Sequence, residues 1–175
     1  KSELSPMKTA HFQSFLDDSE ADAGPARLTA LRKAMSGAQL NGFLVPRSDV
    51  HQGEYVAKCD ERLAWLTGFT GSAGFCAVLP DVAGVFVDGR YRVQVKVQTN
   101  ATFTPVDWPE TSLPTWLQKN LQTGTIGFDP WLHSWGEIKA HRTALGENGI
   151  QLRPNTNLID QIWTDRPDPP NAQAY

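Results

Sequence analysis

The segment from Asp60 to Tyr91 constrains the fold more strongly than any other part of this sequence. It starts with apolar residues at helical spacing, Leu63, Trp65 and Leu66, and then enters a loop that contains three glycines. Two short apolar runs follow on either side of a Pro-Asp pair, a pattern that predicts a β-hairpin. The segment therefore predicts a helix that leads into a sheet through a glycine loop.

The two runs of this hairpin, 75–79 and 82–87, are apolar throughout, which is typical of a sheet covered on both faces. Four further short apolar runs are predicted strands: 42–46, 103–106, 126–129 and 150–152. Helical patterns lie between them: 25–40, 60–66, 91–99, 113–121, 134–145 and 157–163. Because strands that alternate with helices are typical of layered domains, we predict an α/β fold with three layers, αβα, around a central mixed β-sheet.

Short polar side chains stand where several of these helices are predicted to begin. Asp60, Ser134 and Asn157 are predicted N-caps, since such side chains accept hydrogen bonds from the first helical turn. Pro25 stands where a first turn tolerates proline. These residues therefore give the predicted helices their starting points.

The composition suits one folded domain. The chain has 175 residues, of which 40% are hydrophobic and 20% are charged, so it can form a packed core. Its net charge of -3 argues against a nucleic-acid binder, which usually carries a basic face. The sequence contains neither an apolar run of about 18 residues, as a membrane span requires, nor the apolar stretch of a secretory signal. We therefore expect a cytoplasmic protein with no membrane or nucleic-acid partner.

The predicted domain occupies residues 25–164. Residues 1–24 are largely polar and acidic, and we expect them to form a mobile lead-in. The segment 165–175 is rich in proline and cannot continue a helix, so we expect an extended linker toward further domains.

The glycine loop, with Gly68, Gly71 and Gly74, invites comparison with phosphate-binding loops. A Walker loop also needs a lysine, and a dinucleotide loop runs from a strand into a helix. This loop has no lysine and runs in the opposite direction. We therefore interpret Gly68 as a helix C-cap, followed by a tight turn into the sheet.

Ser72 invites comparison with a serine hydrolase, in which His51 would be the base and Asp49 or Asp88 would orient it. A nucleophile elbow needs the pattern GxSxG on a turn from a strand into a helix, and both spacing and direction differ here. The four histidines form no HExxH pair and the carboxylates no cluster at ligand spacing. We therefore expect no catalytic residue, no metal ligand and no bound cofactor in this chain.

The polar loop 47–55, which includes Arg47, Asp49 and His51, follows a predicted buried strand. Open α/β sheets present functional groups beyond such strands. Two interpretations stay open for this loop. Its side chains either stabilise the loop by local hydrogen bonds, or they form a contact surface toward another domain or a neighbouring subunit.

A charged turn ends the predicted hairpin. Asp88 is predicted to cap the next helix, Gly89 to adopt unusual dihedral angles, and the helix to carry Val93 and Val97 on one face. Arg90 could pair locally or point toward a peptide carboxylate or a partner acid. The candidate residues for substrate access or an interface are Arg47, Asp49, His51, Arg90 and Tyr91.

Four motifs in this sequence resemble those of one protein family. They are PRSDVHQGEY at 46–55, LTGFTGSAGF at 66–75, DGRY at 88–91 and IWTDRP at 162–167. Residues 25–170 resemble the N-terminal, creatinase/prolidase-type domain of Xaa-Pro aminopeptidases (aminopeptidase P) in their three-domain form, which are metallopeptidases of the pita-bread family. The resemblance implies a central mixed sheet with helices on both sides, in agreement with the fold predicted from the residues.

The resemblance also implies a function. The parent protein would hydrolyse the N-terminal residue from peptides with proline second, using two divalent metal ions, commonly manganese, in a later catalytic domain. This domain would be non-catalytic and would shape active-site access and subunit contacts. Its partners would be the catalytic domain of the same polypeptide, a second subunit in a homodimer, and the peptide substrate. The alternative is a free-standing module that binds a small molecule or a protein and kept the fold without the enzyme.

Overall fold

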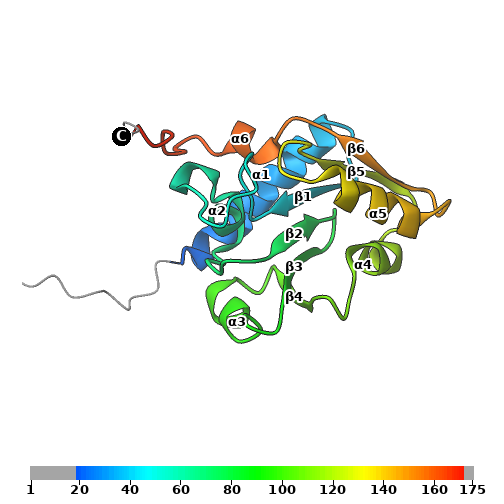
Figure 1. Ribbon diagram of the computed structural model, residues 1–175, viewed down its shortest axis with the longest axis horizontal. Helices are drawn as coiled ribbons and strands as arrows, with labels where there is room; N and C mark the ends of the chain where they lie inside the picture. Colours follow the sequence, from blue (N-terminus) through cyan, green and yellow to red (C-terminus); the bar gives the residue numbers. More distant parts are fainter. Residues whose placement is uncertain (1–18, 172–175) are drawn as a thin grey trace, which may run out of the picture.

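A six-stranded mixed sheet forms the centre of the protein (Figure 1). The computed structural model describes residues 19–171. The strands are β1 (Gly42–Pro46), β2 (Phe75–Val78), β3 (Ala83–Val87), β4 (Thr104–Asp107), β5 (Gly124–Phe128) and β6 (Ile150–Pro154). Their order in the sheet is β4-β3-β2-β1-β5-β6. The hairpin strand β2 is antiparallel to β1 and β3, and the other neighbours are parallel.

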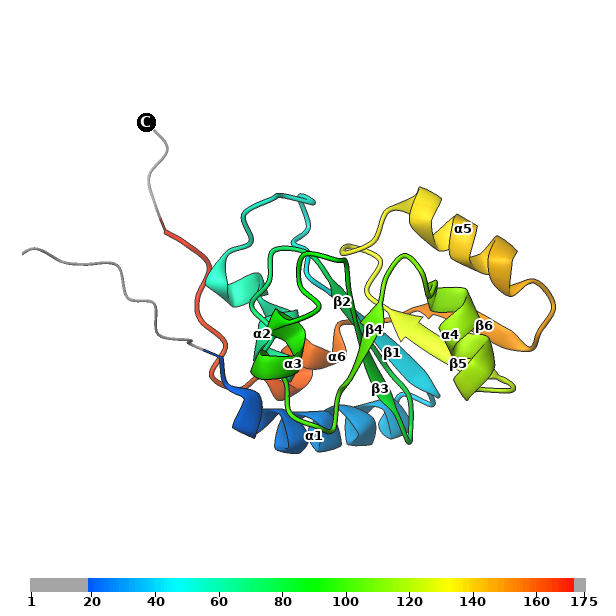
Figure 2. The same ribbon diagram turned by 90° about the horizontal axis from the view of Figure 1, so that it is seen from below.

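Helices cover both faces of this sheet (Figure 2). They are η1 (Ala21–Ala23), α1 (Gly24–Gly37), η2 (Lys58–Asp60), α2 (Arg62–Thr67), α3 (Gln94–Gln98), α4 (Leu113–Asn120), α5 (Trp135–Leu145) and α6 (Leu158–Ile162). Helices α1, α2, α3 and α6 lie on one face, and α4 and α5 lie on the other. The predicted three-layer α/β fold with a mixed sheet is therefore confirmed.

Two apolar cores result from this arrangement because successive residues of a strand point to opposite faces. In β1, Phe43 joins the core under α1 and α2, whereas Leu44 joins the core under α4 and α5. All five residues of β3 are buried. The uninterrupted apolar runs in the sequence thus reflect cover on both faces of the sheet, as predicted.

The predicted helix starts are mostly confirmed. The side chains of Ser134 and Asn157 accept hydrogen bonds from the first turns of α5 and α6. Gly68 ends α2 in the left-handed conformation, with φ 84°. The N-cap prediction for Asp60 is wrong, because α2 begins after Glu61 and no side chain caps it. The Asp60 carboxylate instead accepts hydrogen bonds from two arginines, so charge pairing replaces the cap.

The helix predicted after the hairpin is shorter than the sequence suggested. Asp88 does not cap it, because α3 begins at Gln94 and the Asp88 carboxylate accepts the backbone N–H of Arg90. Gly89 has no positive φ. Val93 and Val97 are exposed, and Val95 is the valine that enters the core. Because this helix is little more than one turn long, two buried residues, Val95 and Gln98, set its face.

The ends of the chain bear on two further predictions. Most of the predicted lead-in, residues 1–18, lies outside the described residues, as does the end of the predicted linker, 172–175. Residues 166–171 contain no helix or strand. The domain limits 25–164 stay a prediction. Among the described residues, no helix combines the length and apolar character needed to cross a membrane.

Candidate functional site

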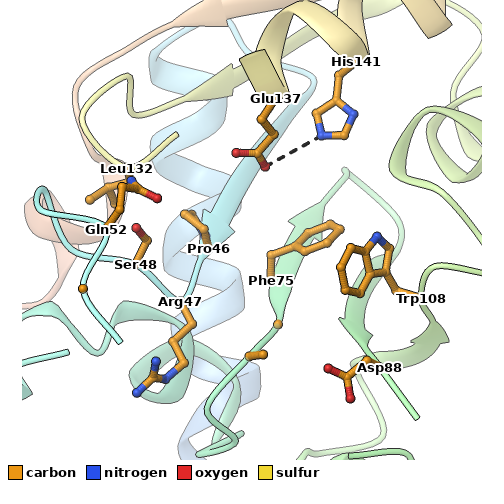
Figure 3. Close-up of a pocket in the computed structure, with 13 residues that line it drawn as sticks. Pro46, Arg47, Ser48, Gln52, Phe75, Asp88, Trp108, Leu132, Glu137 and His141 are labelled. Carbon is orange, nitrogen blue, oxygen red and sulfur yellow. Dashed lines mark ion pairs between the residues drawn. The ribbon is translucent and has the colours of Figure 1, made fainter. Parts of the chain in front are cut away.

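A cleft of about 400 Å³ opens at the carboxyl end of β1, between the start of β2 and the first turns of α5 (Figure 3). Its wall residues come from five separate parts of the chain: Pro46, Arg47, Ser48, Gln52, Gly53, Ala73, Gly74, Phe75, Asp88, Trp108, Leu132, Glu137 and His141. The volume falls in the range typical of small-molecule and peptide-side-chain sites, about 300–1,000 Å³. The cleft is therefore the candidate functional site.

One side of the cleft is aromatic. Phe75 stacks on Phe86 of the neighbouring strand, with ring centroids 4.4 Å apart, so its position is fixed by the sheet. Trp108 follows β4 and stands beside Phe75 with its ring partly exposed (Figure 3). Flat apolar walls of this kind suit the apolar part of a peptide or another ring.

The opposite side of the cleft is charged. Glu137 Oε1 lies 3.8 Å from His141 Nε2 and 3.4 Å from His133 Nδ1, one helical turn away on each side. Burial raises the pKa of the Glu137 carboxyl, but the two imidazoles outweigh burial and hold this pKa at about 2. Ser134 Oγ accepts the Glu137 N–H, which fixes the first turn of α5. The cleft therefore presents a carboxylate opposite its aromatic side.

The lowered pKa of Glu137 predicts a pH dependence of stability. The carboxyl has its ordinary pKa of 4.5 in the unfolded chain and about 2 in the folded one, so the unfolded chain binds more protons between these values. The stabilisation from Glu137 is present above about pH 4.5 and is lost as the pH falls toward 2. We expect the difference in unfolding free energy between wild type and Glu137→Gln to shrink over this range.

Urea unfolding followed by tryptophan fluorescence at a series of pH values measures this difference. Glu147→Gln is the matched control, because Glu147 is exposed just beyond α5 and lines no part of the cleft. If the difference in unfolding free energy between wild type and Glu137→Gln stays constant from pH 6 to pH 2, the pKa of Glu137 is not lowered in the folded protein.

Of the loop residues predicted as candidates, Arg47 lines the cleft, whereas Asp49 and His51 do not. The Arg47 guanidinium points away from α5 and donates to the carbonyl oxygens of Glu54, at 3.2 Å, and Ser72, at 3.0 Å (Figure 3). It therefore ties the polar loop to the glycine loop.

Asp49 stabilises the polar loop from within. Its Oδ1 accepts the backbone N–H groups of Gly53 and His51, and these hydrogen bonds lower the pKa of the Asp49 carboxyl. The His51 side chain is exposed. Local hydrogen bonding, one of the two interpretations left open by the sequence, is thus present, and a contact role for this loop stays a prediction.

Arg90 and Tyr91 lie outside the cleft wall and form a second cluster. Arg90 pairs locally with Asp88, 2.7 Å away, and its side-chain hydrogen bonds lower the pKa of that carboxyl. The Tyr91 hydroxyl is 2.5 Å from Ser72 Oγ, and its ring packs edge-on against Phe69. This cluster braces the glycine loop, and Asp88 extends from it to the edge of the cleft.

The residues considered for hydrolysis do not assemble into a triad. The Ser72 hydroxyl is shared with Tyr91, and no hydrogen bond within residues 19–171 joins Ser72 to His51. In the same part of the chain, no group of three or more His, Cys, Asp or Glu side chains is arranged to hold a metal ion.

Reasoning from the sequence missed Glu137, His141 and Trp108. The spacing of Glu137 and His141, four residues apart in the predicted helix, was a usable signal, because such residues share one face of a helix. No comparable signal marks Trp108, which reaches the cleft only because β4 pairs with β3 at the sheet edge.

Comparisons with known proteins agree with this fold. The family described as Creatinase/Prolidase N-terminal domain matches residues 27–162. Xaa-Pro aminopeptidase 2 of Sus scrofa is 37% identical over 154 residues, which are 86% of this chain and 23% of that protein. The human protein of the same name is 38% identical over 152 residues, 85% of this chain and 23% of its own length.

A solved structure of a related aminopeptidase also matches this chain. The X-prolyl aminopeptidase from Caenorhabditis elegans, described as a cytosolic enzyme with a di-nuclear active site, matches with a TM-score of 0.76 and 29% identity over 83% of this chain and 26% of that one. This chain thus spans about a quarter of the length of the relatives it matches. It belongs to the creatinase/prolidase N-terminal domain family, in the form found in Xaa-Pro aminopeptidase-type proteins.

Proposed function

We propose that this chain is the non-catalytic N-terminal domain of a Xaa-Pro aminopeptidase-like metallopeptidase. The observation that carries the proposal is the match of 86% of the chain to only 23% of pig Xaa-Pro aminopeptidase 2. Hydrolysis of the N-terminal residue before proline would then depend on the remaining three quarters of such a protein. Two divalent metal ions, manganese by resemblance, would be held there.

The role proposed for this domain is to shape access to that active site. The cleft supports the role because it sets an aromatic side, with Phe75 and Trp108, against the carboxylate of Glu137. An extended peptide presents apolar side chains and a positively charged amino group, which fit these two sides. Contacts to the catalytic domain and to a second subunit of a homodimer belong to the same proposal, and the description of the worm relative as cytosolic supports a cytoplasmic location.

The second candidate is a free-standing module that binds a small molecule or a protein. The cleft volume of about 400 Å³ favours it, since that volume is enough for a ligand without any help from another domain. The two proposals differ in what the 175-residue chain does alone.

The test is to incubate the purified chain with manganese and a short peptide that has proline second, and to measure release of the first residue. We expect no release above the buffer blank, while a full-length relative such as pig Xaa-Pro aminopeptidase 2 turns the peptide over under the same conditions. Turnover that co-purifies with the chain and survives Ser72→Ala would contradict the non-catalytic assignment. Turnover lost in Ser72→Ala would point to a hydrolase instead.

Calorimetry with the same peptide tests the binding role. We expect weak binding that Trp108→Ala abolishes and Trp131→Ala leaves unchanged, because Trp131 is also exposed but lies outside the cleft wall. An equal loss of peptide binding in Trp108→Ala and Trp131→Ala would contradict a role for the cleft.

A further inference from the structure

A second cavity, of about 210 Å³, is lined by residues of α5 and by the last residues of β5 and β6. Its apolar walls are Phe128, Pro130, Trp135, Ile138 and Pro154. Its polar side chains are His133, Ser134 and Arg142. The cavity is smaller than a typical ligand pocket, but its mostly apolar wall with few polar groups has the same character and suits one small group.

His133 is the unusual member of this wall. Its side chain is only 4% exposed. Nδ1 faces the Glu137 carboxylate at 3.4 Å, and Nε2 is buried without a hydrogen-bond partner. The ring is held edge-on against Phe128, with centroids 5.7 Å apart. Burying a polar nitrogen without a partner is costly, so a buried nitrogen of this kind needs an explanation, and a ligand is one.

Glu137 determines which kind of partner His133 lacks. The Glu137 carboxylate lies 3.4 Å from His133 Nδ1, on the side of the cleft. In the neutral imidazole, this nearby negative charge favours the tautomer with its proton on Nδ1. In that tautomer Nε2 is an acceptor, and the missing partner is therefore a donor, an N–H or an O–H group.

The other groups around the cavity indicate what the apolar part of the ligand is. Arg142 Nη2 donates to the carbonyl oxygen of Leu152 at 2.9 Å, and its guanidinium lies 6.0 Å from the centre of the Trp135 ring. Trp135 is 70% exposed, although large aromatic side chains usually bury most of their surface. A flat ring that enters between Trp135 and the proline walls would cover it.

We propose that this cavity binds an aromatic group that bears one N–H or O–H donor, and that the donor hydrogen-bonds to His133 Nε2 while the ring packs on Trp135. Indole and phenol are the simplest groups with this chemistry. They occur as tryptophan and tyrosine side chains and as free small molecules. The site is separate from the proposed function, because it needs neither peptide hydrolysis nor another domain.

The test is a titration of the 175-residue chain by ¹H–¹⁵N NMR, read at the indole N–H of Trp135. Indole and 1-methylindole form one matched pair, and phenol and anisole form another, because methylation removes only the donor. We expect indole and phenol to shift the Trp135 signal in a saturable manner, with dissociation constants in the millimolar range. We expect each methylated probe to bind about 3- to 10-fold more weakly, as the loss of one hydrogen bond predicts.

Three variants locate the effect. His133→Leu should abolish the preference for the donor probes, while 1-methylindole still binds. Trp135→Ala should abolish binding of all four probes, read at the remaining signals of α5. Trp131→Ala is the control, because Trp131 is as exposed as Trp135 but is not part of the cavity wall.

The source of the natural ligand is distinguished by N-acetyltryptophanamide. Binding of this probe together with indole would identify a tryptophan or tyrosine side chain as the ligand, whereas binding of indole alone would identify a free small molecule. No saturable shift with any probe would overturn the proposal. A preference for the donor probes that persists unchanged in His133→Leu would overturn it as well.

Discussion

Replacement of Arg62 by alanine is expected to lower the free energy of unfolding by about 3–5 kcal/mol, the loss typical when one partner of a buried ion pair is removed. The Arg62 side chain is only 5% exposed. It contacts two carboxylates, Asp60 and Asp160, which would keep their charge after the substitution. The effect is therefore large because the two acids would lose their buried cation, although Arg166 would stay close to both of them.

The geometry of the charged group formed by Arg62, Asp60 and Asp160 explains why its loss should be so destabilising. Arg62 Nε and Nη2 donate to the two oxygens of Asp160 at 2.6 and 3.0 Å, and Nη1 donates to Asp60 at 2.9 Å. Burial lowers the pKa of Arg62, but the paired carboxylates more than reverse this and raise it above its usual value. Because Asp160 belongs to α6 and Arg62 to α2, the pair joins two helices on the same face of the sheet.

Urea denaturation of Arg62→Ala measures the loss, and Arg90→Ala is the matched control. Arg90 also pairs with an aspartate, Asp88, but its side chain is 66% exposed, so we expect a change within about 0.5 kcal/mol. The double variant Arg62→Ala/Asp160→Ala should recover part of the stability, since it also removes one of the two carboxylates that pair with Arg62. If Arg62→Ala lowers the free energy of unfolding by no more than Arg90→Ala does, the buried charged group contributes nothing to stability.

The same group of charges reaches the end of the domain. Arg166 donates to the carbonyl oxygen of Cys59 and lies 2.9 Å from Asp160 and 3.1 Å from Asp60. Close by, Trp163 stacks on Trp65, with ring centroids 5.2 Å apart. The chain that follows α6 is therefore fixed to α2 as far as Arg166, which sets the direction in which it leaves the fold.

The fold was predictable because its signals are local. The uninterrupted apolar run of β1 shows burial on both faces, and the serine before α5 and the asparagine before α6 mark helix starts in any context. Asp60 misled the prediction for a physical reason. A short acidic side chain before an apolar run can cap a helix or pair with an arginine, and the arginine at 166 lies 106 residues further along the chain.

The candidate site was much less predictable, because it depends on which segments meet. Arg47 lies at the cleft as expected beyond β1, but its guanidinium turns to the loop carbonyls. Trp108 reaches the cleft from the end of β4, an edge strand, whereas Glu137 reaches it from α5, which follows a strand four places away in the sheet. No periodicity within either segment encodes that meeting, so it becomes visible only after the sheet is assembled.

Replacement of Gly68 by alanine is expected to lower the free energy of unfolding by about 3 kcal/mol, from two effects that add. Gly68 has φ 84°, and a left-handed backbone costs a residue with a side chain about 1–2 kcal/mol. A Cβ atom here would also overlap the carbonyl oxygen of Gln98 and stand 3.0 Å from the backbone nitrogen of Ala21. Because both neighbours are backbone atoms, relief would require η1 and the end of α3 to move apart.

Two further glycines separate these effects when all three variants are unfolded in urea. Gly146 has φ 57° and ψ -137°, a glycine conformation outside the left-handed helical region, and no atom lies within 4 Å of the added Cβ, so Gly146→Ala should cost dihedral strain alone, about 1–3 kcal/mol. Gly136 lies in α5 with neither constraint, so Gly136→Ala should stabilise the protein by about 0.5–1 kcal/mol through the better helix propensity of alanine. If Gly68→Ala costs no more than the left-handed backbone alone, about 1–2 kcal/mol, the close approach of three backbone segments at Gly68 is not rigid. The turn between α2 and the sheet would then owe its shape to dihedral preference alone.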